Sequence, residues 1–308
     1  MKKIRVVFSF LLSICLFIDS VCYLREFHAN ATFGISYNVY DAQTGSRINS
    51  MTYTLDNPYS LVNNGTNSTN SVIDNRVIDW SKSGVVKICG SSNYYGTGFV
   101  VDSHVIATAA HVVYDSRTLD TCKVINGIKL YDLNGVVTEI ATPEYIHLAS
   151  SYADEFSIAD DYALITVEED LSDYMCFNLG IALDASFNIN STNYGLPVSI
   201  TGFPQYCAAV QGVANSNTID NKCTSTGNLC DGVALGIIPN NNDADLKVCC
   251  TNYISGGDSG SPIYYSESYN GNNYYTVIGI VSSSSSDYMI GARIDSYLLK
   301  FYLGNPNL

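Results

Sequence analysis

The chain has 308 residues, of which 46% are hydrophobic and 14% are charged, and its formal net charge is −14. This length and composition are typical of a folded protein with a sizeable core, and they exclude an intrinsically disordered chain. The acidic balance argues against a nucleic-acid partner, because the phosphate backbone needs a basic surface.

The N-terminus has the pattern of a secretory signal peptide over residues 1–22. A basic MKKIR segment is followed by an apolar run, VVFSFLLSICLFI, and then by small residues up to Cys22. The apolar run is shorter than the roughly 20 residues that a membrane-spanning helix needs, so we interpret it as a signal and not as an anchor. We therefore expect a secreted, extracellular monomer with no membrane span in its mature form.

Residues 23–70 are predicted to be a propeptide that ends in a linker. The first part is mixed and polar, with strand-like pieces such as TFGISYNVY, and residues 57–75 are rich in Asn, Ser and Thr. Such a composition is typical of a connecting segment. We expect the folded domain to occupy residues 71–308, with a cut in or just after the linker separating it from the propeptide.

Eight cysteines remain after the signal peptide, and five of them lie between residues 207 and 250. In an exported protein this pattern indicates disulfides, although the sequence does not choose among the possible pairings. The alternative is a zinc site, which needs CxxC-type spacing that the chain lacks. We therefore expect no metal and no cofactor.

From Ser83 onward the chain consists of short runs rich in Val, Ile and Tyr, separated by Gly, Asn, Asp and Ser. Examples are GVVKIC, GTGFVV, YALITVE, PVSITGF and YYTVIGIVSS. This pattern is typical of an all-β sandwich or barrel. Helical spacing is scarce except in IDSYLLKFYL, which predicts a short C-terminal helix over about residues 295–303.

His111 is the best candidate for a general base among the four histidines. It ends the buried run VIATAAHVV, which we interpret as a strand, and the two small alanines before it leave room around the imidazole. His28 lies in the predicted propeptide, His147 in a loop-like stretch, and His104 at the start of a strand. The plain alternative for any one histidine is a structural or surface side chain.

Asp161 is the candidate carboxylate for orienting such a base. It stands in ADDYALITV, directly before a strongly apolar strand, whereas its neighbour Asp160 is expected to be solvated. A carboxylate beside a buried strand needs a partner. When that partner is an imidazole, the carboxylate fixes its tautomer and stabilises the imidazolium.

The stretch GGDSGSP, residues 256–262, contains the candidate nucleophile Ser259. By itself the stretch is also typical of a plain tight turn. A serine hydroxyl needs a base to become a nucleophile. Glycines allow the backbone to turn its N–H groups inward, and we predict that those of Gly257 and Ser259 form an oxyanion hole, in which one donor is worth about 3 kcal/mol.

The segments TAAH, DYALI and GDSGSP occur in the order His, Asp, Ser, and this arrangement resembles the chymotrypsin-type serine proteases. His111 and Asp161 are 50 residues apart, and Asp161 and Ser259 are 98 residues apart. The corresponding spacings in chymotrypsin are about 45 and about 93, whereas α/β-hydrolases and subtilisin have other orders.

The resemblance implies an all-β fold of two six-stranded antiparallel β-barrels, at about residues 80–175 and 190–295. It also implies a serine endopeptidase that hydrolyses a polypeptide substrate through an acyl-enzyme. His111, Asp161 and Ser259 would be its catalytic residues.

The chain more closely resembles the bacterial glutamyl endopeptidase, or V8-like, branch over residues 71–305, in segments such as GTGFVV, ITGFP and GGDSGSPIY. Val281 stands where that branch has a histidine that helps to bind an acidic side chain, so a glutamate preference does not carry over. Asp258 stands where the branch has Asn or Gln. In digestive-type enzymes this aspartate pairs with the new N-terminus after activation. Here it pairs either with such a terminus, created between about Asn70 and Val77 in a zymogen, or with a local donor.

The same resemblance places Tyr253 near the base of the substrate pocket, with Ser282, Ser283 and Ser284 along one wall. Such a strand can pair with an extended substrate backbone. The alternative is that SSSSSD is a plain polar loop. No Asp or Arg commits the pocket to a charge.

Two other functions stay open. One is a catalytically inactive adhesive or binding protein at the cell exterior that uses a protease fold, because fold alone does not decide function. The complete His-Asp-Ser set argues against it. The other is an esterase that uses the same triad, which turnover of peptides against esters would separate.

Overall fold

The structure is a computed structural model that describes residues 32–56, 74–91, 94–115, 121–155, 158–180, 197–206, 220–230, 247–269, 271–284 and 289–294. The described chain consists of strands with only short helical turns, which confirms the all-β class predicted from the sequence. None of the helices in these ranges is long and apolar enough to cross a membrane. The predicted signal peptide and C-terminal helix lie outside the described residues.

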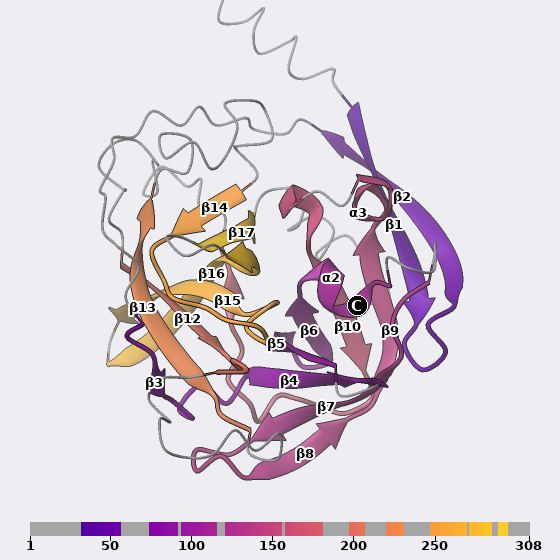
Figure 1. Cartoon of the computed structure of the whole chain (residues 1–308). Helices are drawn as coiled ribbons and strands as arrows, with labels where there is room; N and C mark the ends of the chain where they lie inside the picture. Colours follow the sequence, from indigo (N-terminus) through magenta and orange to yellow (C-terminus); the bar gives the residue numbers. More distant parts are fainter. Residues whose placement is uncertain are drawn as a thin grey trace, which may run out of the picture.

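The first sheet has nine strands in the order β2-β1-β9-β10-β6-β5-β4-β7-β8 (Figure 1). The consecutive strands β9-β10-β6-β5-β4-β7 of this sheet form the predicted first barrel. Its first and last strands, β9 and β7, lie near each other where the barrel closes. Its strands are β1 (Thr32–Asp41), β2 (Arg47–Asp56), β4 (Val85–Gly90), β5 (Tyr95–Asp102), β6 (Val105–Thr108), β7 (Ile125–Tyr131), β8 (Val137–Ala141), β9 (Pro143–Ala149) and β10 (Ala163–Val167). Short helical elements follow or precede these strands: α2 (Ala110–Val113), α3 (Ser150–Glu155) and η2 (Ile158–Asp160).

The second sheet closes into a six-stranded barrel, as predicted. Its order is β11-β16-β15-β12-β13-β14-β17, and a further antiparallel pairing of β17 with β16 completes the ring. Its strands are β11 (Asn178–Leu179), β12 (Pro197–Gly202), β13 (Cys223–Cys230), β14 (Lys247–Cys250), β15 (Pro262–Tyr269), β16 (Asn272–Ser284) and β17 (Met289–Arg293). The two-residue strand β3 (Val77–Ile78) pairs with β13, so the chain touches the second barrel before it builds the first.

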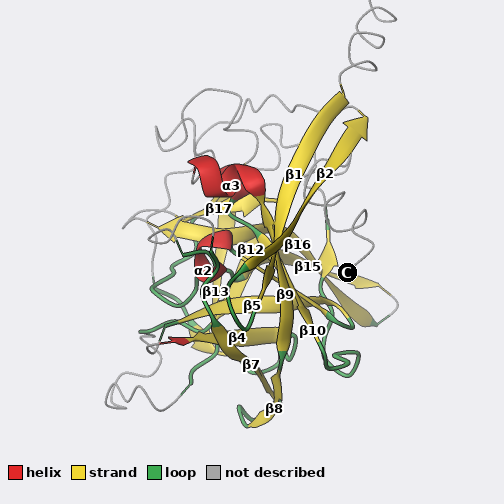
Figure 2. Ribbon diagram, turned by 90° about the vertical axis from the view of Figure 1, so that its right-hand side faces the viewer, coloured by secondary structure: helices red, strands yellow, loops and turns green. Residues whose placement is uncertain are grey.

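The hairpin β1–β2 extends the first sheet with residues that the sequence assigned to a propeptide. Tyr37–Asp41 pair with β9, and the rest of the hairpin projects beyond the body of the molecule (Figure 2). Tyr40 and Ala42 are fully buried against the sheet. The carbonyl of Gly45 accepts a hydrogen bond from the N–H of Cys122 at 2.9 Å. The same pairing shows that His147 lies in the buried strand β9, so its expected place in a loop is wrong.

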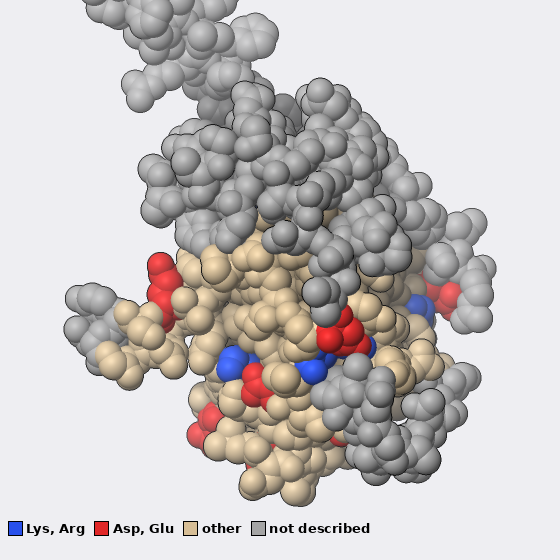
Figure 3. Space-filling view, turned by 60° about the vertical axis from the view of Figure 1, so that its left-hand side comes forward, with Lys and Arg blue, Asp and Glu red and all other residues tan. Residues whose placement is uncertain are grey.

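The described surface carries few charged side chains. On the face shown in Figure 3, basic and acidic groups lie next to each other near the middle, further acidic groups lie toward the left, and most of the surface around them is uncharged. Within the described ranges, three basic side chains are instead buried: Arg76, Lys222 and Arg293. Because a buried cation is unfavourable without partners, Arg76 and Lys222 mark places where the fold supplies hydrogen-bond acceptors.

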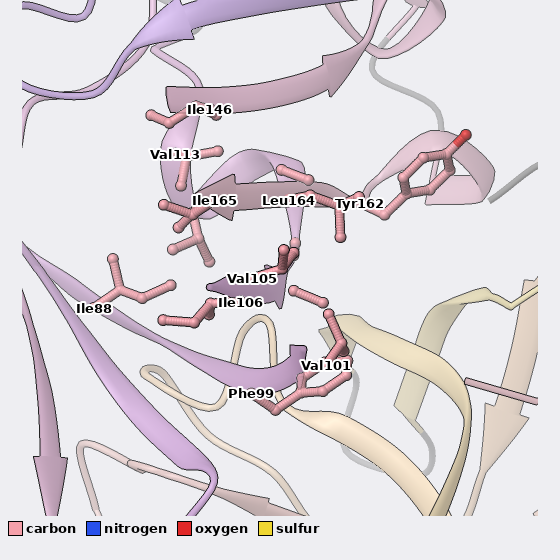
Figure 4. Close-up of a cluster of buried hydrophobic side chains, with 14 of the residues drawn as sticks. Ile88, Phe99, Val101, Val105, Ile106, Val113, Ile146, Tyr162, Leu164 and Ile165 are labelled. Atoms are coloured by element: carbon pink, nitrogen blue, oxygen red, sulfur yellow. The ribbon is translucent and has the colours of Figure 1, made fainter. Parts of the chain in front are cut away.

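The main core is formed by side chains of neighbouring strands that point toward one another (Figure 4). Burying each of these side chains contributes about 1.5–3 kcal/mol. Phe177 continues this core into the second barrel, because its ring lies 5.6 Å from Phe99 on β5 and 5.4 Å from Tyr264 on β15, between ring centres. The labelled strand residues of this core are Ile88, Phe99, Val101, Val105, Ile106, Ile146, Leu164 and Ile165.

Asp220, just before β13, fastens the second barrel to the first. Its carboxylate accepts hydrogen bonds from the ammonium groups of Lys87 and Lys129 and from the hydroxyl of Tyr131. Burial acts to raise the pKa of Asp220, but these hydrogen bonds outweigh it and place the pKa below its ordinary value. The carboxylate is therefore ionised at neutral pH, and it joins β4 and β7 to the start of β13.

Lys222 forms a second junction two residues later. Its ammonium is enclosed by the rings of Trp80, Tyr131 and Phe203, which come from three different parts of the chain. It donates to the carbonyl of Lys82 at 2.8 Å. Burial lowers the pKa of Lys222 to about 7. The junction between the barrels is thus built from aromatic rings around one cation.

We expect a chain that is cut within residues 57–73 to keep residues 32–56 bound. A recognition site for a sequence-specific protease, inserted there, allows the cut to be made in native buffer. The strand pairing with β9 and the burial of Tyr40 should keep the two pieces in one peak during size-exclusion chromatography, with both masses found in that peak. The same sample in concentrated urea is the control and should separate, whereas separation in native buffer would contradict the expectation.

Candidate active site

His111 lies in the short helix α2, directly after β6. The sequence predicted one strand through VIATAAHVV, but β6 ends at Thr108, whose hydroxyl donates to the carbonyl of Thr97 at 2.7 Å. The two small alanines after it are fully buried and allow the chain to turn, and Val112 and Val113 anchor α2 in the core. The His111 side chain itself stays 32% exposed, so it is accessible from solvent.

The backbone position of His111 is further fixed by its carbonyl group. This carbonyl accepts a hydrogen bond from the ammonium of Lys123 at 2.6 Å and one from the hydroxyl of Tyr94 at 3.2 Å. Burial raises the pKa of Tyr94, so its hydroxyl stays protonated and donates. The hydrogen bonds from Lys123 and Tyr94 therefore fix the backbone of the turn that carries the imidazole.

Asp161 lies between η2 and β10 and is brought to His111 by the pairing of β10 with β6. Ala163 pairs with Thr108, so the residues before β10 face the residues after β6. The Asp161 carboxylate accepts from His111 Nδ1 at 2.7 Å and from the His111 backbone N–H at 2.9 Å. It also accepts from the hydroxyl of Ser282. Asp161 is 2% exposed, so these donors are what makes a buried carboxylate tolerable.

This arrangement assigns the tautomer of His111. A carboxylate next to Nδ1 favours the proton on that nitrogen, which leaves Nε2 with a lone pair. An imidazole in this state can accept a proton at Nε2, and Asp161 then stabilises the positive charge that forms. The pair therefore has the arrangement that a general base requires.

The turn that carries Ser259 is fastened to β5 of the first sheet. The N–H of Thr97 donates to the carbonyl of Ser259 at 2.9 Å, and the hydroxyl of Thr97 donates to the carbonyl of Gly257 at 2.7 Å. Gly96 lies between the Ser259 carbonyl and the side chain of Val112, which follows His111. The serine turn and the histidine turn therefore lie against the same strand.

Two glycines give the turn its shape. Gly257 and Gly260 have φ angles of 93° and 85°, a region that glycine adopts without strain. A Cβ at Gly257 would lie 2.3 Å from the carbonyl oxygen of Phe203, and one at Gly260 would lie 2.1 Å from that of Thr97. Within the described chain, the N–H groups of Gly257 and Ser259 donate to no protein atom. Two donors are thus left for a ligand at this turn.

The residues predicted for the substrate pocket are only partly brought together. Tyr253 is half-buried, and its ring faces the guanidinium of Arg76, 4.7 Å from the ring centre. The hydroxyl of Ser282 donates to Asp161, so this side chain also contacts the candidate catalytic carboxylate, and its place along the pocket wall stays a prediction. Ser283 and Ser284 are exposed at the end of β16, opposite Ile290 and Met289 of β17.

The stretch Ser282–Ser284 has an edge that can take another strand. β15 pairs with β16 only as far as Ile280, and the backbone of Val281 is then bonded to the serine turn. Within the described residues, the following stretch pairs with β17 on one side alone. This is the geometry in which an extended peptide can add itself to a sheet.

The sequence reasoning missed one residue of the site, Arg76, and one contact of another, Ser282. Ser282 was placed in the pocket, because a single hydroxyl in a run of serines gives no signal for a partner 121 positions away in the chain. Arg76 was not considered, although an arginine directly before the apolar pair Val77 and Ile78 is unusual in a chain with so few basic residues. Its burial depends on contacts that no local pattern predicts.

The comparisons with known proteins identify the fold and the family of the chain. The family model described as Trypsin matches residues 77–298. A solved structure of a Glu endopeptidase in complex with MPD superposes with a TM-score of 0.58 at 13% identity, over 75% of this chain and 96% of that chain. The VesB protease of Vibrio cholerae superposes with a TM-score of 0.53 at 18% identity, over 75% and 66%. At these identities the two structures show the fold alone.

No protein with a curated description matches the chain significantly. The family match spans more than half of the chain, and it includes His111, Asp161 and Ser259. The chain therefore belongs to the trypsin family, and the protein is a chymotrypsin-like serine endopeptidase.

Proposed function

We propose that the protein cleaves polypeptides through Ser259, His111 and Asp161, by way of an acyl-enzyme. The observation that carries this proposal is the Asp161 carboxylate, which binds both the ring and the backbone N–H of His111. The serine turn adds support, because it is fastened to the strand that also contacts α2. The three groups have the roles of a catalytic triad, which is recognised by geometry and role and not by sequence position.

In the proposed reaction, the Ser259 hydroxyl attacks the carbonyl carbon of the scissile bond while His111 Nε2 takes its proton. The imidazolium, stabilised by Asp161, then protonates the leaving amine and the C–N bond breaks. A water molecule, deprotonated by the same nitrogen, hydrolyses the ester and restores Ser259. The reaction needs only groups of this chain and water.

The N–H groups of Gly257 and Ser259 are proposed to bind the oxyanion of each tetrahedral intermediate. Their lack of a protein acceptor in the described chain supports this role. A donor that is already aimed at the developing charge contributes about 3 kcal/mol to transition-state stabilisation. The positive φ of Gly257 supports the same reading, because it turns the peptide unit without a side-chain clash.

The substrate is proposed to lie extended along Ser282–Ser284, with its backbone paired to this edge of β16. The side chain before the cleaved bond would then point toward Tyr253. Val281 is fully buried and apolar at the place where the V8-like branch carries its histidine. We therefore do not extend a glutamate preference to this protein.

We propose that the protein is exported, because its N-terminus has the pattern of a signal peptide. One pair of cysteines supports this proposal. Cys230 and Cys249 are register partners on β13 and β14, and their sulfur atoms lie 2.9 Å apart. Two thiols in this position can be joined with little movement when an external disulfide oxidises them. Such bonds persist in exported proteins.

A fluorophosphonate probe tests the nucleophile directly. We expect intact mass spectrometry to find one probe adduct on the wild type and none on Ser259→Ala, because only a serine with an assembled base reacts. Ser283→Ala is the matched control and should still take up one probe. A folded wild type without any adduct would support the alternative of an inactive binding protein.

Ser282→Ala tests whether the second barrel helps to orient Asp161. A hydrogen bond to a charged group is worth about 1.5–3 kcal/mol, so kcat/KM on a peptide substrate should fall about 10- to 100-fold. The loss should lie in kcat, because the change removes no backbone contact with the substrate. Ser266→Ala, at an exposed serine of β15, serves as control, and equal losses in both variants would contradict a specific role for Ser282.

Peptide mapping tests the cysteine pair. Digestion of the secreted protein without reductant should release a fragment in which Cys230 and Cys249 are linked, and this fragment should split after reduction. In Cys230→Ser, Cys249 should become open to alkylation in the unfolded protein without reductant. Alkylation of both cysteines in unreduced wild type would show that the bond does not form.

A further inference from the structure

The buried side chain of Arg76 contacts the segment that leads into the oxyanion turn at three points. Its guanidinium lies over the ring of Tyr253, donates to the hydroxyl of Ser255 at 2.9 Å, and lies 3.6 Å from the carboxylate of Asp258. The Arg76 side chain is 2% exposed. The guanidinium of Arg76 therefore contacts both ends of this segment, at Tyr253 near the candidate pocket base and at Asp258 before Ser259.

Asp258 is connected to the same set of contacts. Its carboxylate accepts from the N–H of Ser255 at 2.9 Å, and its own N–H donates to the Ser255 carbonyl at 3.1 Å. The carboxylate is also confined from the other side, because a Cβ at Gly202 would lie 2.7 Å from it. The position of Asp258 thus fixes the peptide unit that follows it, which carries the N–H of Ser259. Gly257, whose N–H is the second donor of the proposed oxyanion hole, directly precedes Asp258 in the same turn.

Arg76 is placed by a segment that is anchored to the second barrel. The side-chain amide of Asn75 donates to the carbonyl of Thr226 at 2.7 Å and accepts from its N–H at 3.2 Å. Val77 and Ile78 then pair with β13, and the N–H of Asp79 donates to the carbonyl of Lys222 at 2.9 Å. The guanidinium is aimed by Asp74, which accepts from Arg76 Nε at 2.9 Å and from Nη2 at 3.0 Å.

The charged and titratable groups that face Asp258 are Arg76 and Asp74 from this segment and Tyr95 from β5. Burial raises the pKa of Asp258 to about 7, while the Ser255 N–H and Arg76 act to lower it. Without Arg76, Asp258 would face only the carboxylate of Asp74 and a phenol. An ionised Asp258 would then be a buried charge with no cation, which is strongly unfavourable.

We propose that Arg76 is a positioning residue that supplies the cation for Asp258 from within the chain, so that the oxyanion turn forms without a newly cut N-terminus. The proposal rests on the proposed function of Ser259. The sequence left two partners open for Asp258, a newly cut N-terminus and a local donor, and Arg76 is the local donor. It also follows that a cut before Asp74 leaves the contact intact, whereas a cut after Arg76 removes it.

Replacement of Arg76 tests its role. We expect Arg76→Gln to lower kcat/KM on a peptide and the rate of fluorophosphonate labelling about 10- to 100-fold, less than the complete loss of an oxyanion donor. Arg76→Lys keeps the charge and should recover part of the loss. The matched control is Arg47→Gln, which removes an exposed cation from β2 and should leave both rates unchanged.

A double variant separates this role from a merely structural one. If Arg76 acts by compensating the charge of Asp258, then Arg76→Gln/Asp258→Asn should label faster than Arg76→Gln alone. A general loss of folding would predict the opposite. Labelling of Arg76→Gln at the wild-type rate would overturn the proposal while leaving Ser259 as nucleophile, whereas a wild type that takes up no probe would defeat the proposed function itself.

The pH dependence of stability gives a second readout. A carboxyl whose pKa is raised on folding stabilises the fold fully below its ordinary pKa near about 4, and this contribution is lost as the pH rises through about 7. Without Arg76 the pKa of Asp258 rises further, so the loss continues to higher pH. We expect the Tm of Arg76→Gln to fall more steeply between neutral and alkaline pH than that of the wild type, and parallel curves would count against the proposal.

The intact mass of the probe-treated protein tests whether the uncut chain has a reactive Ser259. A probe adduct on chains that are uncut between residues 32 and 76 is the expected result. Adducts confined to chains that begin at a newly cut terminus would overturn the inference. So would an active form that begins at Val77, because Arg76 would then be absent.

Discussion

The buried carboxylate of Asp161 is the interaction on which the rest of the site depends, because it takes donors from both barrels. The ring and the N–H of His111 reach it from the first sheet, and the hydroxyl of Ser282 reaches it from the second. A carboxylate that is almost fully shielded from water is unfavourable until such donors are in place. The full set of donors to Asp161 therefore exists only when the two barrels are docked in one arrangement.

The docking is specified by polar groups as well as by apolar packing. Asp220 joins Lys87, Lys129 and Tyr131 of the first sheet to the start of β13. Thr97 does the same on the serine side, since its hydroxyl also accepts from the N–H of Phe203 at 3.0 Å. Hydrogen bonds have narrow distance and angle requirements, so these groups select one arrangement among those that the apolar contacts would allow.

The sequence predicted the parts of the site that lie in short continuous segments. TAAH, DYALI and GDSGSP carry their chemistry within a few residues, and the alternation of apolar runs and turn residues predicted the all-β class. The exact positions at which strands end could not be predicted from the sequence. The run that contains His111 was taken as one strand, but the bond from Thr108 to Thr97 and the turn of α2 end it earlier.

The contacts that no pattern predicted join residues that are far apart in the chain. Arg76 and Ser255 are separated by 179 positions, and Asp161 and Ser282 by 121. The hairpin β1–β2 was recognised only as strand-like pieces, because its partner β9 lies about a hundred residues later and its own composition is polar. The signal peptide, the propeptide boundary and the terminal helix stay predictions, since they fall on residues outside the described ranges or on processing.

The residues before the barrels contact both of them, and this links the N-terminal region to the active site. Residues 32–56 cover the edge of β9 in the first sheet, whereas residues 74–79 lie on β13 of the second. Loss of the first contact would expose the backbone groups of a strand edge, which is a common cause of aggregation. Loss of the second would leave Asp258 with a buried charge beside the oxyanion turn. In an acidic chain, where cations are scarce, an arginine that is buried at this point is therefore better explained by the needs of Asp258 than by general stability.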